Sequence, residues 1–256
     1  MLPFFFGSKK RALFGSFEPA THRGGAGAAL LCGSWGTEYT NAHRAMRVLS
    51  KRLCAAGFDT LRFDYFGAGD SGGETIDAEL DGWKNDIGTA LRELTEMSGT
   101  SRIAIIGMRL GATLVVEAAP QLPARVDSVV LWDPILCGTD YLNSLQTPQG
   151  DRRETTPVSP MCGPPEVAAS QLGGLLVSSS FIDGLRSIDL SSREVRLPSN
   201  VLTIFSNNQH RECNIGSASK DSEVAILEAP SPWRDSADQE EGLPVEVFER
   251  ILKWLR

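Results

Sequence analysis

Short apolar runs along this chain alternate with longer stretches whose apolar residues recur at helical spacing. The runs are rich in β-branched and aromatic residues and end at Gly, Pro, Asn or Ser, which predicts strands. The predicted strands lie at 2–7, 11–19, 25–35, 58–67, 101–107, 126–134, 200–208 and 223–230. The run at 103–107 is continuously apolar, as expected of a central parallel strand buried on both faces.

The stretches between these runs predict helices. One helix is expected to begin at Thr40 or Asn41 and to stop at Gly57, because its apolar residues fall on one face. Further helices are predicted at about 78–97, 110–122 and 244–256, the last with a proline in its first turn. Strands that alternate with helices predict a mostly parallel sheet covered on both faces.

This order predicts a single α/β domain over 1–256 that opens with an antiparallel hairpin. The segment at about 137–198 interrupts the alternation of strands and helices. It is rich in Pro, Gly and Ser and contains one predicted helix, near 165–185. We interpret it as a short cap insertion over the carboxyl edge of the sheet. Ligands of open α/β sheets bind at that edge.

Composition narrows the classes of function. The net charge of -7 argues against nucleic acid as a partner, since a phosphate backbone needs a basic footprint. No apolar run approaches the roughly 20 residues that span a bilayer, and the basic residues of "MLPFFFGSKK" follow its apolar part, the reverse of a signal peptide. Five scattered cysteines without a CxxC pair favour reduced thiols, a cytoplasmic location and no metal site. No cofactor is expected, because the glycines of "FDYFGAGDSGG" do not match a dinucleotide-binding fingerprint. The apolar "LPFFF" strand suggests an exposed edge and a possible homodimer.

One motif carries the chemistry. The strand that ends at 107 leads through Gly107-Met108-Arg109-Leu110-Gly111 into a predicted helix. Strand–Gly-x-Ser-x-Gly–helix is the nucleophile elbow of the α/β-hydrolases, whose fold the whole order of elements resembles. Here arginine stands at the position of the serine.

Three stretches resemble one branch of that fold more closely. They are "LLCGSWGTEYTNAHRAMRVLSKRLCAAGFDTLRFDYFGAGDSGG" at 30–73, "GMRLGATL" at 107–114 and "VVLWDPILCGTDYL" at 129–142. They are similar to the exosortase-system-associated hydrolases and their relatives in biosynthetic gene clusters, in which the elbow commonly reads Gly-x-Arg-x-Gly-Ala. The resemblance implies that arginine at the elbow belongs to the branch and that the reaction is a hydrolysis.

The other positions of the family's usual triad also differ. The family carries its acid after the strand that follows the cap, where this chain has Asn207 and Asn208. It carries its histidine after the last strand, where Trp233 stands.

Two roles are open for Arg109. It cannot attack a carbonyl, because its guanidinium stays protonated and has no lone pair to donate. Beside the N-terminus of a helix it can hold an anionic or carbonyl group of a substrate. Alternatively it is an internal strut paired with a buried acid, for which Glu38, Asp64 and Asp133 are candidates.

The loop after the third strand supplies further candidates. The family builds its oxyanion hole from backbone N–H groups, which correspond here to Ser34 and Leu110. Glu38 and Tyr39 follow on the same loop, and Met108 precedes the elbow arginine. Glu38 is the favoured partner of Arg109 or the general base, unless it is only a solvated acid in the first turn of a helix.

Three other residues are candidates for proton transfer or binding. Asp133 ends the strand after the elbow, where it either orients a base or caps the turn before Pro134. His210 follows the strand after the cap, and His43 lies in the predicted first turn of the first helix. A loop histidine and a helix histidine are each also explained by a purely structural role.

Two functions of different classes follow. The first is an enzyme that hydrolyses or transfers the acyl group of a small-molecule or carrier-bound ester or thioester in a biosynthetic pathway, without the usual Ser-His-Asp triad. Arg109 and the N–H groups of Ser34 and Leu110 would bind the substrate, aided by Met108, Tyr39 and His43, and Glu38, Asp133 or His210 would transfer protons. The second is a catalytically silent scaffold that binds an anionic ligand or a partner protein.

Overall fold

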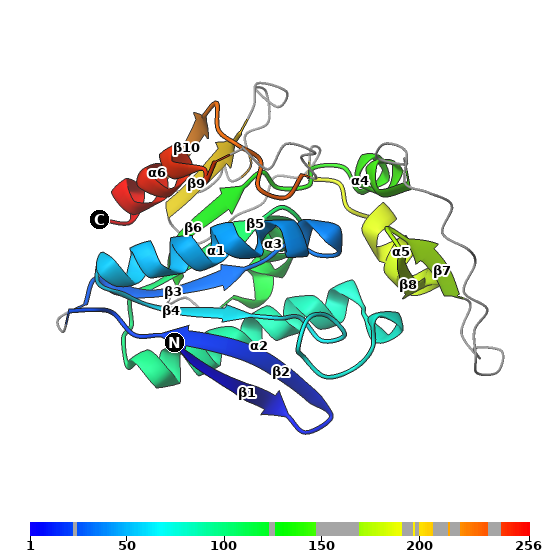
Figure 1. The fold of residues 1–256 in the computed structure, drawn as a ribbon, viewed down its shortest axis with the longest axis horizontal. Coiled ribbons are helices and arrows are strands. Elements are labelled where there is room, and N and C mark those ends of the chain that lie inside the picture. The colour runs from blue at the N-terminus through cyan, green and yellow to red at the C-terminus, as the bar shows by residue number, and fades with distance from the viewer. Residues whose placement is uncertain are drawn as a thin grey trace.

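One twisted sheet organises the chain (Figure 1). The computed structural model describes residues 1–22, 25–122, 126–146, 169–190, 197, 200–206, 215, 221–234 and 242–256. Eight strands form the sheet in the order β1-β2-β4-β3-β5-β6-β9-β10. Their bounds are β1 (Leu2–Ser8), β2 (Arg11–Glu18), β3 (Gly27–Cys32), β4 (Phe58–Phe63), β5 (Ile103–Met108), β6 (Val126–Trp132), β9 (Asn200–Phe205) and β10 (Asp221–Ile226).

The N-terminal hairpin is the antiparallel part of the sheet. β1 pairs with β2, and β2 pairs with β4, both in antiparallel register. From β4 to β10 every pair of neighbouring strands is parallel. The predicted mostly parallel sheet with an N-terminal antiparallel hairpin is therefore confirmed.

Helices cover both faces of the sheet. α1 (Thr37–Ala55) and α6 (Val245–Leu255) share one apolar core with alternate residues of the central strands, among them Leu31 and Ile106. α2 (Leu80–Ser98) and α3 (Leu110–Ala118) share the other core with the intervening residues, among them Leu30 and Ile105. Odd- and even-numbered residues of the central strands are both buried because helices cover both faces of the sheet. This explains the continuous apolar runs of the sequence. Figure 1 shows α1 and α6 on the same side of the sheet.

Several element boundaries differ from prediction. α1 begins at Thr37, because Gly36 adopts φ 65° and turns the chain into the helix earlier than Thr40. His43 therefore lies in the second turn. Pro244 precedes α6 as its N-cap residue instead of lying in its first turn.

The segment after β6 contains more structure than predicted. α4 (Gly138–Gln146) was not expected, and the predicted helix near 165–185 is wrong over 169–178. There the chain forms a separate hairpin of β7 (Ala169–Leu172) and β8 (Leu175–Ser178). α5 (Ser179–Arg186) begins only after Ser178, whose side chain accepts a hydrogen bond from the Phe181 N–H and so caps the helix. Residues 147–168 lie outside the described part of the chain.

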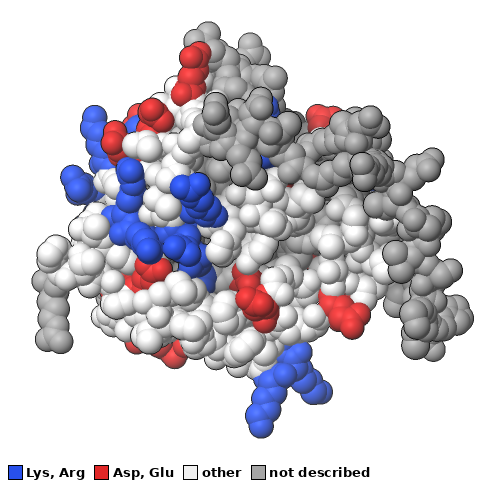
Figure 2. Space-filling model, viewed as in Figure 1, with Lys and Arg blue, Asp and Glu red and all other residues white. Residues whose placement is uncertain are grey.

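Surface charge is unevenly distributed. Figure 2 shows basic side chains gathered on the face that α1 covers. The exposed residues of α1 include Arg44, Arg47 and Lys51.

Among the residues that the structure describes, none of the helices has the length and hydrophobicity that crossing a bilayer requires. The same residues contain no group of His, Cys, Asp and Glu side chains arranged to hold a metal ion.

The turn between β5 and α3 fixes the position of Arg109. Arg109 has φ 54° and ψ -123°, and its N–H donates to the carbonyl of Trp132 at 2.9 Å. A Cβ on Gly107 would lie 2.4 Å from Ala112 Cα, and one on Gly111 would lie 2.3 Å from the Gly33 carbonyl oxygen. The two glycines of the motif therefore let α3 start directly against β3 and β5, and the turn projects residue 109 from the carboxyl edge of the sheet.

We expect Gly107→Ala and Gly111→Ala each to lower the free energy of unfolding by about 2 kcal/mol or more, because the added methyl group meets backbone atoms that cannot move aside. Gly88→Ala in α2 is the matched control, since its Cβ would lie 4.0 Å from its nearest neighbour, the Arg92 Nη1. This control should raise stability by about 1 kcal/mol. Urea unfolding of the three variants checks the expectation, and equal stabilities for Gly111→Ala and Gly88→Ala would contradict it.

Candidate active site

Arg109 forms a partly buried ion pair with Glu38. The Arg109 Nε donates to Glu38 Oε1 at 3.0 Å, and the Arg109 Nη2 lies 2.9 Å from the same oxygen. The Arg109 Nη1 donates to the main-chain carbonyl of Asp133 at 3.3 Å. The second carboxylate oxygen of Glu38 accepts a hydrogen bond from the Tyr141 hydroxyl at 3.2 Å. Both oxygens of Glu38 thus accept hydrogen bonds from side chains of other elements.

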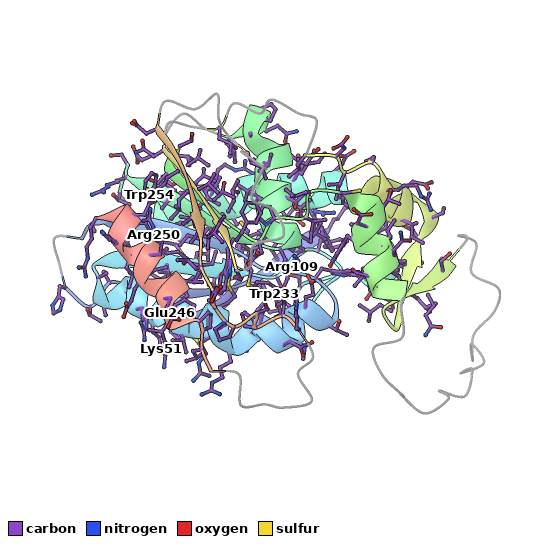
Figure 3. The ribbon with its side chains drawn as sticks, turned by 90° about the horizontal axis from the view of Figure 1, so that it is seen from above. Lys51, Arg109, Trp233, Glu246, Arg250 and Trp254 are labelled. Carbon is purple, nitrogen blue, oxygen red and sulfur yellow. The ribbon has the colours of Figure 1, made fainter. Side chains whose placement is uncertain are left out.

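Aromatic rings enclose the guanidinium. The Arg109 Cζ lies 5.2 Å from the centroid of the Trp233 ring and 5.9 Å from that of Tyr141. Figure 3 shows Arg109 and Trp233 next to each other above the centre of the sheet. Such contacts attract a cation through the ring quadrupole. Trp233, at the position where the family implies a histidine, therefore acts here as a wall beside the cation.

Asp133 contributes through its backbone as well as its side chain. It has φ 44°, and its N–H continues the sheet by donating to the Ile204 carbonyl. Its carboxylate accepts from the Ser206 N–H at 3.0 Å and from the Ser206 hydroxyl at 2.6 Å. The Ser206 hydroxyl in turn accepts from the Trp132 indole N–H at 3.1 Å. The side chain of Asp133 therefore ties the ends of β6 and β9 together, while its carbonyl faces Arg109.

A cavity of about 390 Å³ adjoins this cluster. Its walls include Glu38, Arg109, Asp133, Tyr141 and Trp233, and also Cys137, Asp140 and Arg234. The volume lies in the range of sites that bind small molecules. The acids in these walls outnumber the arginines, so the cavity does not present the net positive charge expected of a simple anion clamp.

Burial sets the protonation behaviour of the cluster. It raises the pKa of Glu38 above its usual value, and the nearby Asp133 charge adds to this effect, whereas Arg109 and the Tyr141 hydroxyl oppose it. Burial and the neighbouring Glu38 raise the pKa of Tyr141 well above normal, so its hydroxyl remains a donor. A carboxylate at a cavity wall whose pKa is raised above its usual value is suited to accept a proton.

The other predicted residues that the structure describes do not line the cavity beside Arg109. Ser34 and Tyr39 line a second cavity of about 250 Å³ between the ends of β3 and β4. Together with His43 and Met108 they also line a small adjoining chamber of about 40 Å³. Leu110 is buried in the core at the start of α3, and His210 lies outside the described residues.

Sequence reasoning missed three residues of the site. Tyr141 lies on α4, which the pattern does not predict; the stretch at 129–142 that resembles the family branch includes it but assigns it no role. The sequence marks Trp233 only as a departure from the family pattern, and it predicts Ser206 as part of a strand. Each acquires its role through contacts between segments far apart in the sequence.

Comparisons with known proteins agree with this architecture. Residues 39–154 match the family described as serine aminopeptidase, S33. A comparison with curated protein sequences finds no match.

Solved structures resemble the chain over nearly its whole length. Est1E from Butyrivibrio proteoclasticus with bound ferulic acid has a TM-score of 0.68 at 16% identity, covering 98% of this chain and 99% of its own. A soluble variant of monoglyceride lipase from Saccharomyces cerevisiae, in complex with a substrate analog, has a TM-score of 0.67 at 15% identity, covering 100% and 95%. Proline iminopeptidase from Mycobacterium smegmatis has a TM-score of 0.62 at 13% identity, covering 99% and 97%. Together with the sheet order and the tight β5–α3 turn, these likenesses show that the chain has the α/β-hydrolase fold.

Proposed function

We propose that this chain is an enzyme of the α/β-hydrolase fold that hydrolyses or transfers the acyl group of a small ester or thioester in a biosynthetic pathway. The substrate is either a free small molecule or an acyl group on a carrier. The observation that carries the proposal is Glu38, a buried carboxylate with a raised pKa at the wall of a cavity of about 390 Å³. Glu38 is the general base, and it replaces the covalent nucleophile that the elbow lacks.

The residues of the cluster divide the reaction between them. Glu38 removes a proton from a water molecule, or from the hydroxyl of an acceptor, as that oxygen attacks the acyl carbonyl carbon. The carbonyl π bond breaks and leaves a negative charge on its oxygen, which the guanidinium of Arg109 stabilises. When the tetrahedral intermediate collapses, the alcohol or thiol leaves and takes the proton back from Glu38. The acid or the new ester is the other product.

The supporting residues hold this pair in place. Tyr141 donates to Glu38 and Trp233 packs against Arg109, so the base and the cation are fixed before substrate enters. The carboxylate of Asp133 is occupied by Ser206, which favours a positioning role for Asp133 over proton transfer. Since Ser34 lines another cavity, Arg109 takes the charge-stabilising role expected of the backbone N–H groups.

The class of substrate has support from the structural relatives. The names of the relatives include a monoglyceride lipase in complex with a substrate analog and Est1E with bound ferulic acid. These names describe those proteins and not this chain. Because a shared fold does not establish a reaction, an ester substrate for this chain is part of the proposal.

A specific observation also favours the second candidate, a catalytically silent scaffold that binds an anionic ligand or a partner protein. The donors of Arg109 described above all point to protein groups, Glu38 and the Asp133 carbonyl. This is the geometry of a strut that holds the cavity wall in shape. The two candidates differ in whether the ion pair turns over substrate.

We expect wild-type protein to hydrolyse short p-nitrophenyl esters or acyl thioesters, with a rate that rises with pH through the raised pKa of Glu38, because the base acts only when ionised. Glu38→Gln should lower the rate by about 100-fold or more and abolish this rise. Glu246→Gln, on the exposed side of α6, is the matched control and should leave both unchanged.

A fluorophosphonate probe should label no serine of the protein. Ligand binding without turnover by wild type would favour the scaffold, and labelling of a single serine would contradict the assignment of Glu38.

We expect Arg109→Met to lower the free energy of unfolding by about 3 kcal/mol, because Glu38 is left buried without its cation. Adding Glu38→Gln should recover much of this loss, since the neutral amide needs no counter-charge. Arg186→Met removes an ion pair with Asp183 whose side chains are both exposed, and it should change stability little. Urea unfolding measures all three, and additive losses in the double variant would show that the two side chains do not interact.

A further inference from the structure

We propose that the second cavity, between the carboxyl ends of β3 and β4, is a binding site for an organic ammonium ion that carries a small apolar or aromatic group. The site is separate from the proposed acyl chemistry, because neither Arg109 nor Glu38 lines it.

Four aromatic side chains line this cavity of about 250 Å³. Trp35, Tyr39, Phe63 and Tyr65 come from the loop after β3, from α1 and from the end of β4. An apolar cavity of about 150 Å³ suffices for benzene, so this one has room for one ring with a short substituent. Rings around a cavity attract a cation through their quadrupoles, most strongly where water is excluded.

Asp64 is the one charged residue in these walls, which contain no Lys, Arg or His. Its side chain accepts hydrogen bonds from the Tyr39 hydroxyl at 2.8 Å and from the Asp70 N–H at 3.0 Å. No Lys, Arg or His nitrogen of the described residues lies within ion-pair distance of it, since none of the ion pairs includes Asp64. Arg62 and His43 line the small adjoining chamber that Asp64 also borders, but neither lies within ion-pair distance of its carboxylate. A buried carboxylate whose direct hydrogen-bond donors are neutral complements a cationic ligand.

A second polar group points to a missing partner. The Ser34 hydroxyl is buried, with 3% of the residue exposed, and it has no hydrogen-bond partner among the described residues. Ser34 lines both this cavity and the small chamber beside it. Buried hydroxyls without a partner are rare in folded proteins, and a ligand N–H would satisfy this one.

Several charged and titratable groups surround Asp64. Burial raises the pKa of Asp64, and the charge of Asp70 adds to this effect. The hydrogen bonds from the Asp70 N–H and the Tyr39 hydroxyl lower this pKa, as does the nearby His43. Arg62 on β4 also lies near Asp64, whose charge opposes the lowering of the Arg62 pKa by burial. Because an ammonium ion binds the ionised carboxylate, its affinity should increase as the pH rises through the pKa of Asp64.

The competing explanation is that Asp64 only shapes the turn after β4. A Cβ on Gly69 would lie 2.2 Å from Asp64 Oδ2, so the loop does pack closely against this carboxylate. The turn accounts for one hydrogen bond to Asp64, whereas it explains neither the aromatic walls nor the unpaired hydroxyl of Ser34.

Isothermal titration with three matched probes tests the proposal on the full chain. We expect benzylamine to bind, benzyl alcohol to bind with an affinity lower by roughly tenfold or more, and benzoate not to bind. Only the amine offers both a ring and a positive charge. Raising the pH from about 5 to 7.5 should strengthen benzylamine binding and leave benzyl alcohol unchanged. Equal affinities for amine and alcohol, or no binding of either, would overturn the proposal.

Variants locate the site. Asp64→Asn should remove the preference for amine over alcohol, with residual binding of the alcohol as evidence that the cavity is intact. Ala68→Phe should fill the cavity and abolish binding of both probes, and it keeps the test decisive if Asp64→Asn does not fold. Asp81→Asn, an exposed acid on α2, is the matched control and should change nothing. Glu38→Gln should leave benzylamine binding unchanged. Loss of benzylamine binding in this variant would place the ligand in the cavity beside Arg109 and overturn the proposal.

Discussion

The close approach of α3 to β3 and β5 is the constraint on which the rest of this molecule depends. With hydrogen atoms as side chains at Gly107 and Gly111, the first turn of the helix packs directly on the backbone of Gly33 and against β5. The chain can make so sharp a turn only if residue 109 takes a positive φ, which holds its side chain out at the carboxyl edge of the sheet. Relatives of this fold use that position for a hydroxyl nucleophile. The same backbone here presents a permanent cation.

A cation at that position must be neutralised, and this requirement shapes the surroundings. Glu38 reaches Arg109 because α1 begins at Thr37, close to the end of β3. Tyr141 then holds the remaining carboxylate oxygen, and Trp233 covers the guanidinium. The result is a fixed base and a fixed positive charge beside a cavity, an arrangement that replaces covalent attack by preorganised electrostatics in the function we propose.

The two cavities have different characters because the loops that wall them differ in charge. The cavity beside Arg109 contains charges of both signs, with acids in excess. The cavity beside Asp64 is aromatic and contains a single carboxylate. The start of α1 lies between them, with Glu38 facing one and Tyr39 facing the other. Adjacent residues of one helix thus contribute to two sites of different chemistry.

The sequence by itself determined the sheet, its hairpin and the elbow motif. The apolar runs of the sequence indicate which strands are buried. The glycines at 107 and 111 are required because a Cβ at either position would collide with nearby backbone atoms. It also supplied Glu38, Asp64 and Asp133 as candidates for the partner of Arg109. Only the tertiary structure shows that Glu38 is the carboxylate paired with Arg109, and it gives Trp233 and Tyr141 their roles. It also shows that Ser34 lines the second cavity. Those outcomes depend on contacts between residues as far apart as 38 and 141, and local patterns of polarity contain no information about such distances.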